Sequence, residues 1–258
     1  MDLHAGSANL ILMKFAQSLR KWRCLRRFSQ LDLANEAGIS SKHLSFLETG
    51  RSSPSKQMVI KLAETLQLPL DAQNQMLTDA GFAVSYTNSD WSETEMIPVR
   101  EALDHMLKSH MPYPGLVLDR FWRVVQFNRA AEHLYGLFGI HQGDSLIKHL
   151  TTGVLSEVIE NWAEVAHFAA LRLKAESMAQ GGIPEFDAAI PKLINDEMVL
   201  ENIVSPVIPI VIKQGSVRIS MFSTITQVGT PKDVVLDDIK LELYFPLDKR
   251  TDEFFKEK

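Results

Sequence analysis

Residues 30–49 constrain the fold more than any other segment, because a small residue, a glycine and an apolar face occur there at fixed spacing. Ala34 stands where a close crossing of two helices needs a small side chain. Gly38, four positions later, permits the positive φ of a tight turn. The apolar positions that can bury one shared face are Leu33, Ala37, Ile39, Leu44 and Leu47. An ordinary helical hairpin is the alternative, but it does not need all these positions to agree, so we predict two helices crossing at a short turn.

The first 82 residues as a whole are predicted to be helical. Apolar residues recur at spacings of three and four along residues 10–27, which is typical of one helix face. Ser29 and Ser55 are residue types that cap helix N-termini. We predict helices over residues 10–27, 30–37, 56–66 and 70–80, and one that begins at Ser40 or Ser41 and ends at Gly50. These five helices make a domain of residues 1–82, and the polar residues 83–96 are predicted to be a linker.

Residues 97–258 have strand-like runs at both ends and helical patterns between them. A two-residue turn between runs 115–119 and 122–127 predicts a β-hairpin. The other predicted strands are 207–213, 216–227 and 239–245, and the predicted helices are 99–109, 129–138, 152–179 and 186–197. This order predicts a second domain of α+β class, with one antiparallel sheet covered on a face.

Charge is distributed unevenly along the chain. Residues 1–66 contain ten Lys and Arg against five Asp and Glu, whereas the whole chain has a formal net charge of −5. Residues 67–258 therefore carry −10. Such asymmetry is typical of a segment that faces nucleic acid joined to one that does not, although a soluble helical domain can also be basic.

Composition and motifs exclude several classes of protein. The longest apolar run, Val207 to Ile212, is far shorter than the roughly 18 residues that span a bilayer. The N-terminus lacks a basic stretch followed by an apolar one, so we expect no signal peptide. Nucleotide-binding glycine motifs, serine-hydrolase motifs and zinc-ligand spacings are absent, so we predict no catalytic residues, no metal, no cofactor and no enzyme activity. The single cysteine, Cys24, favours a reducing compartment and is either a redox sensor or a plain half-buried residue.

Two sets of motifs resemble a known family of regulators. The pairs and runs Ser29-Gln30, Leu33-Ala34, Gly38-Ile39-Ser40, Leu44-Ser45, Leu47 to Arg51 and Pro54-Ser55 resemble the lambda-repressor-like (XRE) helix-turn-helix domain over about residues 9–82. The run Lys42 to Arg51 resembles the corresponding run of bacterial regulators whose second half is an MmyB-like ligand-binding domain of PAS-like fold. That half agrees at Tyr113-Pro114, Asp119-Arg120, Asn128 to Ala131, Asn161-Trp162, Phe222 to Thr226 and Gly229-Thr230-Pro231. The resemblance implies a multidomain fold, an all-α five-helix lambda-repressor-like domain followed by an α+β PAS-like domain.

The resemblance also implies which residues contact DNA. They are Gln30, Ser40, Ser41, Lys42, His43, Phe46, Arg51 and Lys56. Lys42 can donate to guanine, and Gln30, Arg51 and Lys56 can hold phosphates. Phe46 either touches a thymine methyl or packs inward, and His43 either lies at the rim of the contact or has no role. Glu48 is expected to be structural, since a carboxylate aimed at DNA would repel it.

A PAS-like domain implies a ligand pocket between the sheet and its helices. The candidate ligand residues are Phe127, Phe138, Asn161, Trp162, Phe222 and Thr224, all of which could equally be ordinary core. An apolar pocket would suit a small hydrophobic effector, for example a fatty-acyl compound. The expected protein is a cytoplasmic, nucleoid-associated bacterial one-component transcription regulator that binds double-stranded DNA as a homodimer and no membrane. The alternatives are a DNA-targeted enzyme and a partner-binding adaptor.

Overall fold

The computed structural model describes residues 3–194, 206–229 and 231–257, and the side chains of these residues from Leu10 onwards. The chain divides into two compact units. The N-terminal unit comprises Met1–Asn88 with the short segments Met178–Gly182 and Lys232–Val234, and the rest forms the C-terminal unit.

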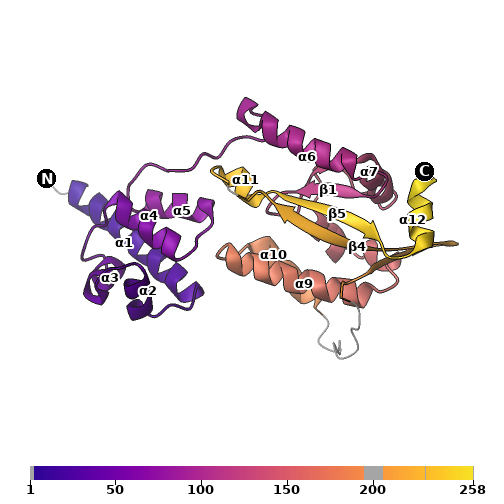
Figure 1. Ribbon diagram of the computed structural model, residues 1–258. Coiled ribbons are helices and arrows are strands. Elements are labelled where there is room, and N and C mark those ends of the chain that lie inside the picture. Colours follow the sequence, from indigo (N-terminus) through magenta and orange to yellow (C-terminus); the bar gives the residue numbers. More distant parts are fainter. Residues whose placement is uncertain (1–2, 195–205, 230, 258) are drawn as a thin grey trace. The chain divides into compact units, whose positions relative to one another are not determined.

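The N-terminal unit contains the five predicted helices (Figure 1). They are α1 Leu3–Leu25, α2 Gln30–Glu36, α3 Ser41–Glu48, α4 Lys56–Thr65 and α5 Leu70–Asp79. Helix α1 begins earlier than the periodicity of the sequence predicted. The all-α prediction for this part of the chain is confirmed.

Serine side chains fix where the short helices begin. Ser29 accepts from the backbone N of Asp32 at 3.1 Å, and the carboxylate of Asp32 accepts in turn from the backbone N of Ser29, so the two form a capping box. Ser40, rather than Ser41, caps α3, because its hydroxyl accepts from the backbone N of His43. Between α2 and α3, Gly38 adopts a φ of +60°, the turn conformation for which the sequence predicted a glycine.

Four of the five residues predicted to form the shared face, Leu33, Ala37, Leu44 and Leu47, are buried, and Ile39 is half-buried. Leu33, Ala34, Leu44 and Leu47 are fully shielded from solvent and pack with Phe15 of α1 in one apolar cluster. The small side chain of Ala34 allows the two helices to approach closely. Burial of these side chains fixes which side of α3 remains exposed.

The first part of the predicted linker is held by hydrogen bonds within the N-terminal unit. Asn74 of α5 accepts from the backbone N of Ser85 and of Tyr86 at 3.1 Å, and it donates to the carbonyl of Tyr86 at 2.9 Å. The Tyr86 hydroxyl also donates to Gln73. Residues up to Asn88 therefore group with the helices rather than forming a free connection.

The C-terminal unit is built on a five-stranded antiparallel sheet in the order β2-β1-β5-β4-β3. The strands are β1 Gly115–Leu118, β2 Val124–Phe127, β3 Ile210–Gln214, β4 Val217–Gln227 and β5 Lys240–Pro246. The antiparallel sheet and the α+β class predicted from the sequence are confirmed.

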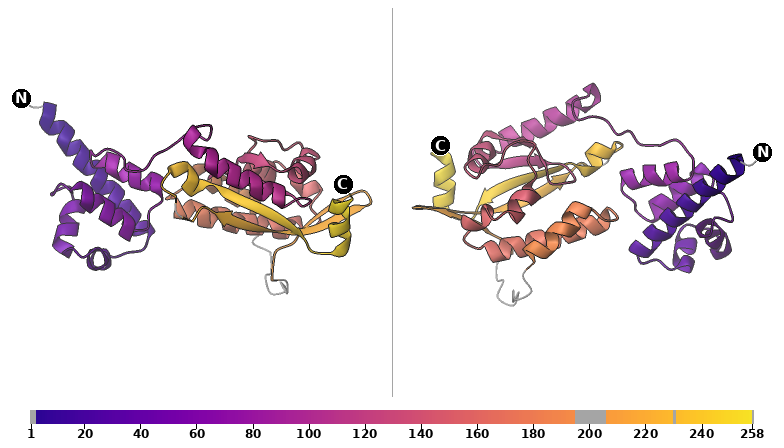
Figure 2. Two further views of the ribbon diagram at one scale, coloured as in Figure 1. Left: turned by 45° about the horizontal axis from the view of Figure 1, so that its top comes forward. Right: turned by 180° about the vertical axis from the view of Figure 1, so that it is seen from behind.

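Helices lie on both faces of this sheet, as Figures 1 and 2 show. The longer helical elements are α6 Ile97–Ser109, α7 Arg129–Gly136, α8 Leu146–Thr151, α9 Trp162–Ala179, α10 Pro184–Leu193 and α12 Lys249–Lys256; the short ones are η1 Thr94–Met96, η2 Leu155–Glu157 and α11 Val234–Asp238. Leu103 and Leu107 of α6 pack against Val117 and Leu241 on one face. The opposite face packs against the larger apolar cluster, which includes Leu173 and Phe186. The sheet is thus covered on both faces, not on one as predicted.

The first hairpin does not have the predicted two-residue turn. Five residues, 119–123, connect β1 to β2, and the carboxylate of Asp119 accepts from the backbone N of Phe121 and of Arg123, both at 2.8 Å. Trp122 leaves the strand with a φ of +56° and is 5% exposed. Strand β2 therefore begins at Val124, two residues after the start of the predicted run.

The predicted single helix over 152–179 is wrong. Gly153, with a φ of +91°, separates α8 from η2. Ile159 then forms an isolated β-bridge to Ile212 of β3, which is an edge strand of the sheet. Only from Trp162 does the chain run as one helix. The predicted helix 186–197 begins earlier, at Pro184, and ends at Leu193, while residues 195–197 and Thr230 lie outside the described residues.

Candidate functional site

Helix α3 is two-sided, and its N-terminal end carries the exposed polar side. Ser41, Lys42 and His43 are exposed, whereas Leu44 and Leu47 are buried. Phe46 is half-buried, and the Lys42 ammonium lies 5.8 Å from its ring centroid. The ring of Phe46 thus lies beside the exposed face without being enclosed by the core. The Ser40 hydroxyl is used by the helix cap.

Glu48, at the last turn of α3, is a buried structural residue. Its carboxylate accepts from Arg23 Nε at 2.5 Å and from Arg23 Nη2 at 3.1 Å, and it accepts from Gln30 Nε2 at 2.7 Å. The hydrogen bond from Arg23 to Glu48 raises the pKa of the guanidinium, although burial opposes this. The three side chains tie α1, α2 and α3 together. Gln30 has a second amide N–H that this bond does not use.

The remaining residues proposed to contact DNA are exposed at the ends of neighbouring helices. Arg51 follows α3, and its backbone N donates to the carbonyl of Phe46. Lys56 is the first residue of α4, whose start is capped by Ser55. The cations Lys42, Arg51 and Lys56 are thus all exposed, and the side chain of Gln30 is half-buried.

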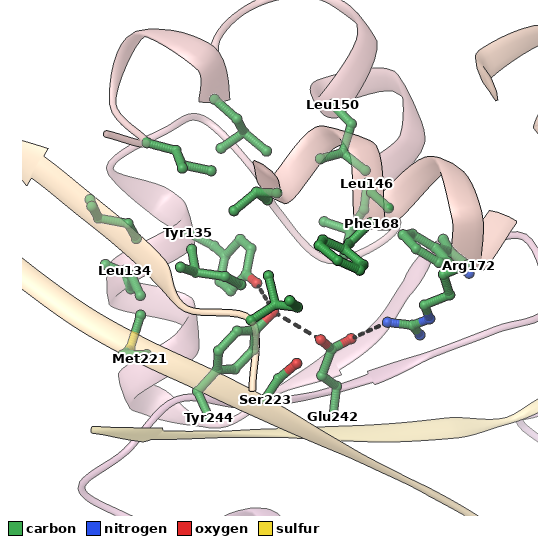
Figure 3. A pocket seen from close by; sticks show the side chains of 18 of the residues that line it. Leu134, Tyr135, Leu146, Leu150, Phe168, Arg172, Met221, Ser223, Glu242 and Tyr244 are labelled. Carbon is green, nitrogen blue, oxygen red and sulfur yellow. Dashed lines mark hydrogen bonds and ion pairs between the residues drawn. The ribbon is translucent and has the colours of Figure 1, made fainter. Parts of the chain in front are cut away.

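A cavity of about 300 Å³ lies in the C-terminal unit between the sheet and the helices (Figure 3). Its walls are mostly apolar and come from distant parts of the sequence; they include Leu134, Tyr135, Phe138, Leu146, Leu150, Phe168 and Met221. Leu155 and Ile159, from the segment predicted to be helix, also line it. The break at Gly153 therefore helps to form the cavity. We call it the sheet cavity.

Of the predicted ligand residues, Phe138 lines the sheet cavity and two others point away from it. Successive side chains of a strand alternate between faces, and on β4 it is Met221, Ser223 and Ile225 that line the cavity. Phe222 and Thr224 lie on the opposite face, where Phe222 stacks on Phe245 with ring centroids 5.5 Å apart. Their prediction as pocket residues is wrong by one position of register.

Phe127, Asn161 and Trp162 support the cavity from outside rather than lining it. Phe127 stacks on Tyr135 with ring centroids 5.4 Å apart. Asn161 donates to the carbonyl of Pro209 at 2.8 Å and accepts from the backbone N of Val211 at 3.0 Å, so it fixes the start of β3. Trp162 packs against the large apolar cluster. These three residues were predicted as ligand contacts, and the structure assigns them packing and positioning roles.

One end of the sheet cavity is charged, and sequence reasoning missed it. Arg172 and Glu176 of α9 meet Lys240 and Glu242 of β5, and we call these four residues the polar corner. Arg172 Nε lies 3.0 Å from Glu176 Oε1, Arg172 Nη1 lies 3.4 Å from Glu242 Oε2, and Lys240 Nζ pairs with Glu176. Tyr135 and Tyr244 adjoin it, with their hydroxyls 2.7 Å apart, and Tyr244 donates to Glu242 (Figure 3).

The polar corner could have been predicted from the alternation of polar and apolar side chains along β5. Lys240, Glu242 and Tyr244 point toward α9, while Leu241 and Leu243 pack on the α6 side. In a central strand that is buried on both faces, charged residues at every second position indicate a buried charged cluster. The sequence alone does not reveal that this strand is central.

Burial and pairing set the ionisation of the polar corner. Burial raises the pKa of Tyr135 and of Tyr244 well above the ordinary phenol value, so both hydroxyls keep their protons. Burial lowers the pKa of Arg172, but Glu242 and Glu176 outweigh this and the net change is upward. Burial raises the pKa of Glu176, but Lys240 and the Trp122 indole N–H outweigh this and the net change is downward.

Metal ligands, the cysteine and apolar helices are three further features that bear on function. Within the described part of the chain there is no group of three or more His, Cys, Asp or Glu that could hold a metal ion. Cys24 is exposed rather than half-buried. No helix among the described residues combines the length and apolar character needed to cross a membrane.

Comparison with known families identifies both units. A helix-turn-helix family model matches residues 19–73, and the model of the MmyB-like transcription regulator ligand binding domain matches residues 99–198. The chain is an XRE-family regulator with an MmyB-like ligand-binding domain. No curated protein matches it.

The two matched segments include the predicted DNA-contact residues and part of the polar corner of this DNA-binding transcription regulator. The first spans α2, α3 and α4 and so includes all eight residues predicted to contact DNA. The second spans α6 to α10 and so includes Arg172 and Glu176, but it ends before β4 and β5. Half of the polar corner therefore lies beyond the matched segment.

Proposed function

We propose that this XRE-family regulator reads a specific operator through α3 and that a small apolar effector in the sheet cavity changes its affinity for that operator. The observation that carries the first half is the two-sidedness of α3, which exposes Ser41 and Lys42 while burying Leu44 and Leu47. A recognition helix must present its N-terminal side chains to base edges and bury the opposite flank. No second sensor protein is needed, so the regulator is of one-component type.

The proposed contacts divide into base reading and docking. Lys42 donates to guanine O6 or N7, Ser41 bonds a neighbouring base edge, and Phe46 offers its ring edge to a thymine methyl. Gln30, Arg51 and Lys56 hold phosphates, which fixes the position of α3 without reading sequence. Ser40 contributes by capping the helix, and His43 lies at the rim.

A homodimer acting in the bacterial cytoplasm, at the nucleoid, completes the proposal. One helix-turn-helix reads only a few base pairs, so two copies on a two-fold site, with centres roughly 34 Å or a multiple apart, are needed for specificity. The effector acts if it binds one arrangement of the two DNA-binding units better than the other.

We propose no enzyme activity for the C-terminal unit. A general acid or base at neutral pH needs a carboxylate or histidine whose pKa is moved toward neutrality. In the polar corner Glu176 is moved the other way, and Glu242 is paired with Arg172. The charged groups of the cavity are therefore better suited to binding than to proton transfer.

The experiment for the proposed function is operator selection followed by ligand linkage. The full chain is used to select duplexes from a random pool, and affinity for the selected duplex is measured with and without saturating methyl decanoate, an apolar probe that fits the proposed class. A change in affinity for the selected duplex supports the proposal. An affinity that methyl decanoate leaves unchanged, at concentrations shown to fill the cavity, contradicts the effector half.

A further inference from the structure

Strand β4 is longer than its outer neighbour β3. It has 11 residues, whereas β3 has 5 and pairs with β4 only as far as Ile210, opposite Met221. Pro209, directly before β3, has no backbone N–H with which to extend the ladder, and its carbonyl accepts from Asn161 instead. Among the residues that the structure describes, none pairs with this side of segment 223–227, and only β5 flanks it.

Hydrogen bonds on the β5 side show which backbone groups face the open side. The carbonyl of Ser220 accepts from the backbone N of Leu247, which directly follows β5. Tyr244, opposite Ser223, donates to Pro114 on the β1 side instead. Backbone groups of successive strand residues point to opposite sides, so every second residue after Met221 faces away from β5. These residues are Ser223, Ile225 and Gln227, which we call the open edge.

The open edge has none of the features that keep exposed strands apart. Natural edges are protected by charged side chains, by Pro or by β-bulges. Residues 219–229 contain no charged residue and no Pro, although residues 67–258 carry a net charge of −10. Thr224, Ile225 and Thr226 are residue types that favour strands, and Ile225 is 44% exposed. This edge is therefore open to pairing with another strand.

The sequence of this segment matches an antiparallel copy of itself. With Ile225 opposite Ile225 of a second copy, Ser223 lies opposite Gln227 and Thr224 opposite Thr226. Residues of the open edge then exchange N–H···O bonds, as alternate pairs of an antiparallel ladder do. No like charges meet, which is a condition for a symmetric pair of strands.

An apolar strip lies beside the open edge. Phe222, Leu243 and Phe245 share the α6 side of the sheet and are half-buried, and Phe222 stacks on Phe245. Stable protein interfaces bury about 1,200 Å² or more, which two short strands do not reach by themselves. The strip offers a second copy apolar surface that is continuous with the strand.

We propose that a second copy of this chain docks on the open edge, with the two β4 strands antiparallel about a two-fold axis at Ile225. The two five-stranded sheets then form one continuous sheet. This inference rests on the proposed function, because it assigns the surface through which the proposed homodimer forms. Ser223 and Ile225 also line the sheet cavity, so the interface adjoins it.

The first test adds charges in two patterns. In the proposed dimer, Thr224→Lys with Thr226→Lys places like charges opposite each other, whereas Thr224→Lys with Thr226→Glu places opposite charges there. Both threonines are exposed and neither lines the sheet cavity. By sedimentation equilibrium of the full chain, we expect the first variant to weaken dimerisation at least about tenfold and the second to stay within about threefold of wild type.

Gln214→Lys with Ser216→Lys, at the exposed hairpin turn, is the control and should leave dimerisation unchanged. Thermal melts confirm that each variant is folded. Equal weakening by both charge patterns overturns the antiparallel pairing at Ile225. A dimer that neither pattern weakens overturns the inference and leaves the proposed homodimer intact. A full chain that is monomeric both free and on the selected duplex contradicts the homodimer and the inference together.

Hydrogen exchange of the wild-type chain tests the same pairing without a variant. The backbone N–H groups of the open edge should exchange at least about tenfold more slowly above the dimer dissociation constant than below it, because pairing protects them. Those of Thr224 and Thr226, which point toward β5, should change less. If sedimentation shows a dimer but exchange at the open edge does not depend on protein concentration, the proposal is wrong.

Discussion

Lys42 is the residue on which base reading depends most in this account, because it is exposed at the N-terminal end of α3. Lys42→Ala should reduce the discrimination between selected and random duplex by about 1–3 kcal/mol. Lys14→Ala, which removes an exposed charge of the same sign from α1, is the matched control. Equal weakening of both duplexes by Lys42→Ala would mean that this residue holds a phosphate instead.

Glu48 should matter for stability rather than for sequence reading. Its removal leaves the Arg23 side chain, which is 12% exposed, without its carboxylate partner. Glu48→Ala is therefore expected to lower the free energy of unfolding by about 3–5 kcal/mol, measured by urea titration. Glu36→Ala, on an exposed acidic residue of α2, should cost no more than about 0.5 kcal/mol. Equal effects of the two substitutions would show that the Arg23–Glu48 pair is not important for the fold.

At the scale of elements, the short N-terminal helices could be predicted because their signals are local. Ser29, Ser55 and Gly38 act within one turn of their own position, and the structure has them in the predicted caps and turn. The predictions that failed concern segments whose structure depends on contacts with residues far away in the sequence. The helix predicted over 152–179 breaks where Ile159 bridges to Ile212. Gly153 is the one local feature of the sequence that indicates this break.

The sheet cavity could be predicted in kind but not in detail. The resemblance implied an apolar space between the sheet and its helices, and Phe138, one of the predicted ligand residues, lines the cavity. Which face of β4 meets it depends on register, and one position of error exchanged Met221 and Ser223 for Phe222 and Thr224. The charged residues of β5 were missed because the central position of that strand is a property of the whole sheet.

The pairing of α9 with β5 predicts a pH dependence of stability. The pKa of Glu176 is lowered in the folded chain, so as pH falls the unfolded chain takes up this proton first, near the ordinary value of about 4.3. The stabilisation by this carboxylate is complete above that pH and is lost as pH falls through the lower folded value. Below pH of about 4, Glu176→Gln should make the free energy of unfolding less steep in pH by up to about 1.4 kcal/mol per unit. Identical slopes in denaturant melts of variant and wild type would contradict the lowered pKa.

At the scale of the whole molecule, we expect the N-terminal unit to bind DNA and the C-terminal unit to bind the effector and to form the dimer. A fragment of residues 1–88, which keeps the hydrogen bonds of Asn74 to Ser85 and Tyr86, should fold cooperatively. By sedimentation it should be monomeric, and it should bind the selected duplex more weakly than the full chain because it lacks the second DNA-binding unit of a dimer. A fragment ending at residue 82 is the control and should be less stable. A dimeric 1–88 fragment of undiminished affinity would refute this division.

DNA recognition by this regulator depends on α3 presenting its exposed end to the bases of a specific duplex. The most direct measurement is the affinity of the full chain for the selected duplex and for a scrambled duplex of the same composition, each over a range of salt concentrations. We expect a preference for the selected duplex of at least about a thousandfold at physiological salt. Both affinities should also fall steeply as salt rises, because both depend on phosphate contacts. Equal affinity for the two duplexes, or binding that salt does not weaken, would contradict this mode of recognition.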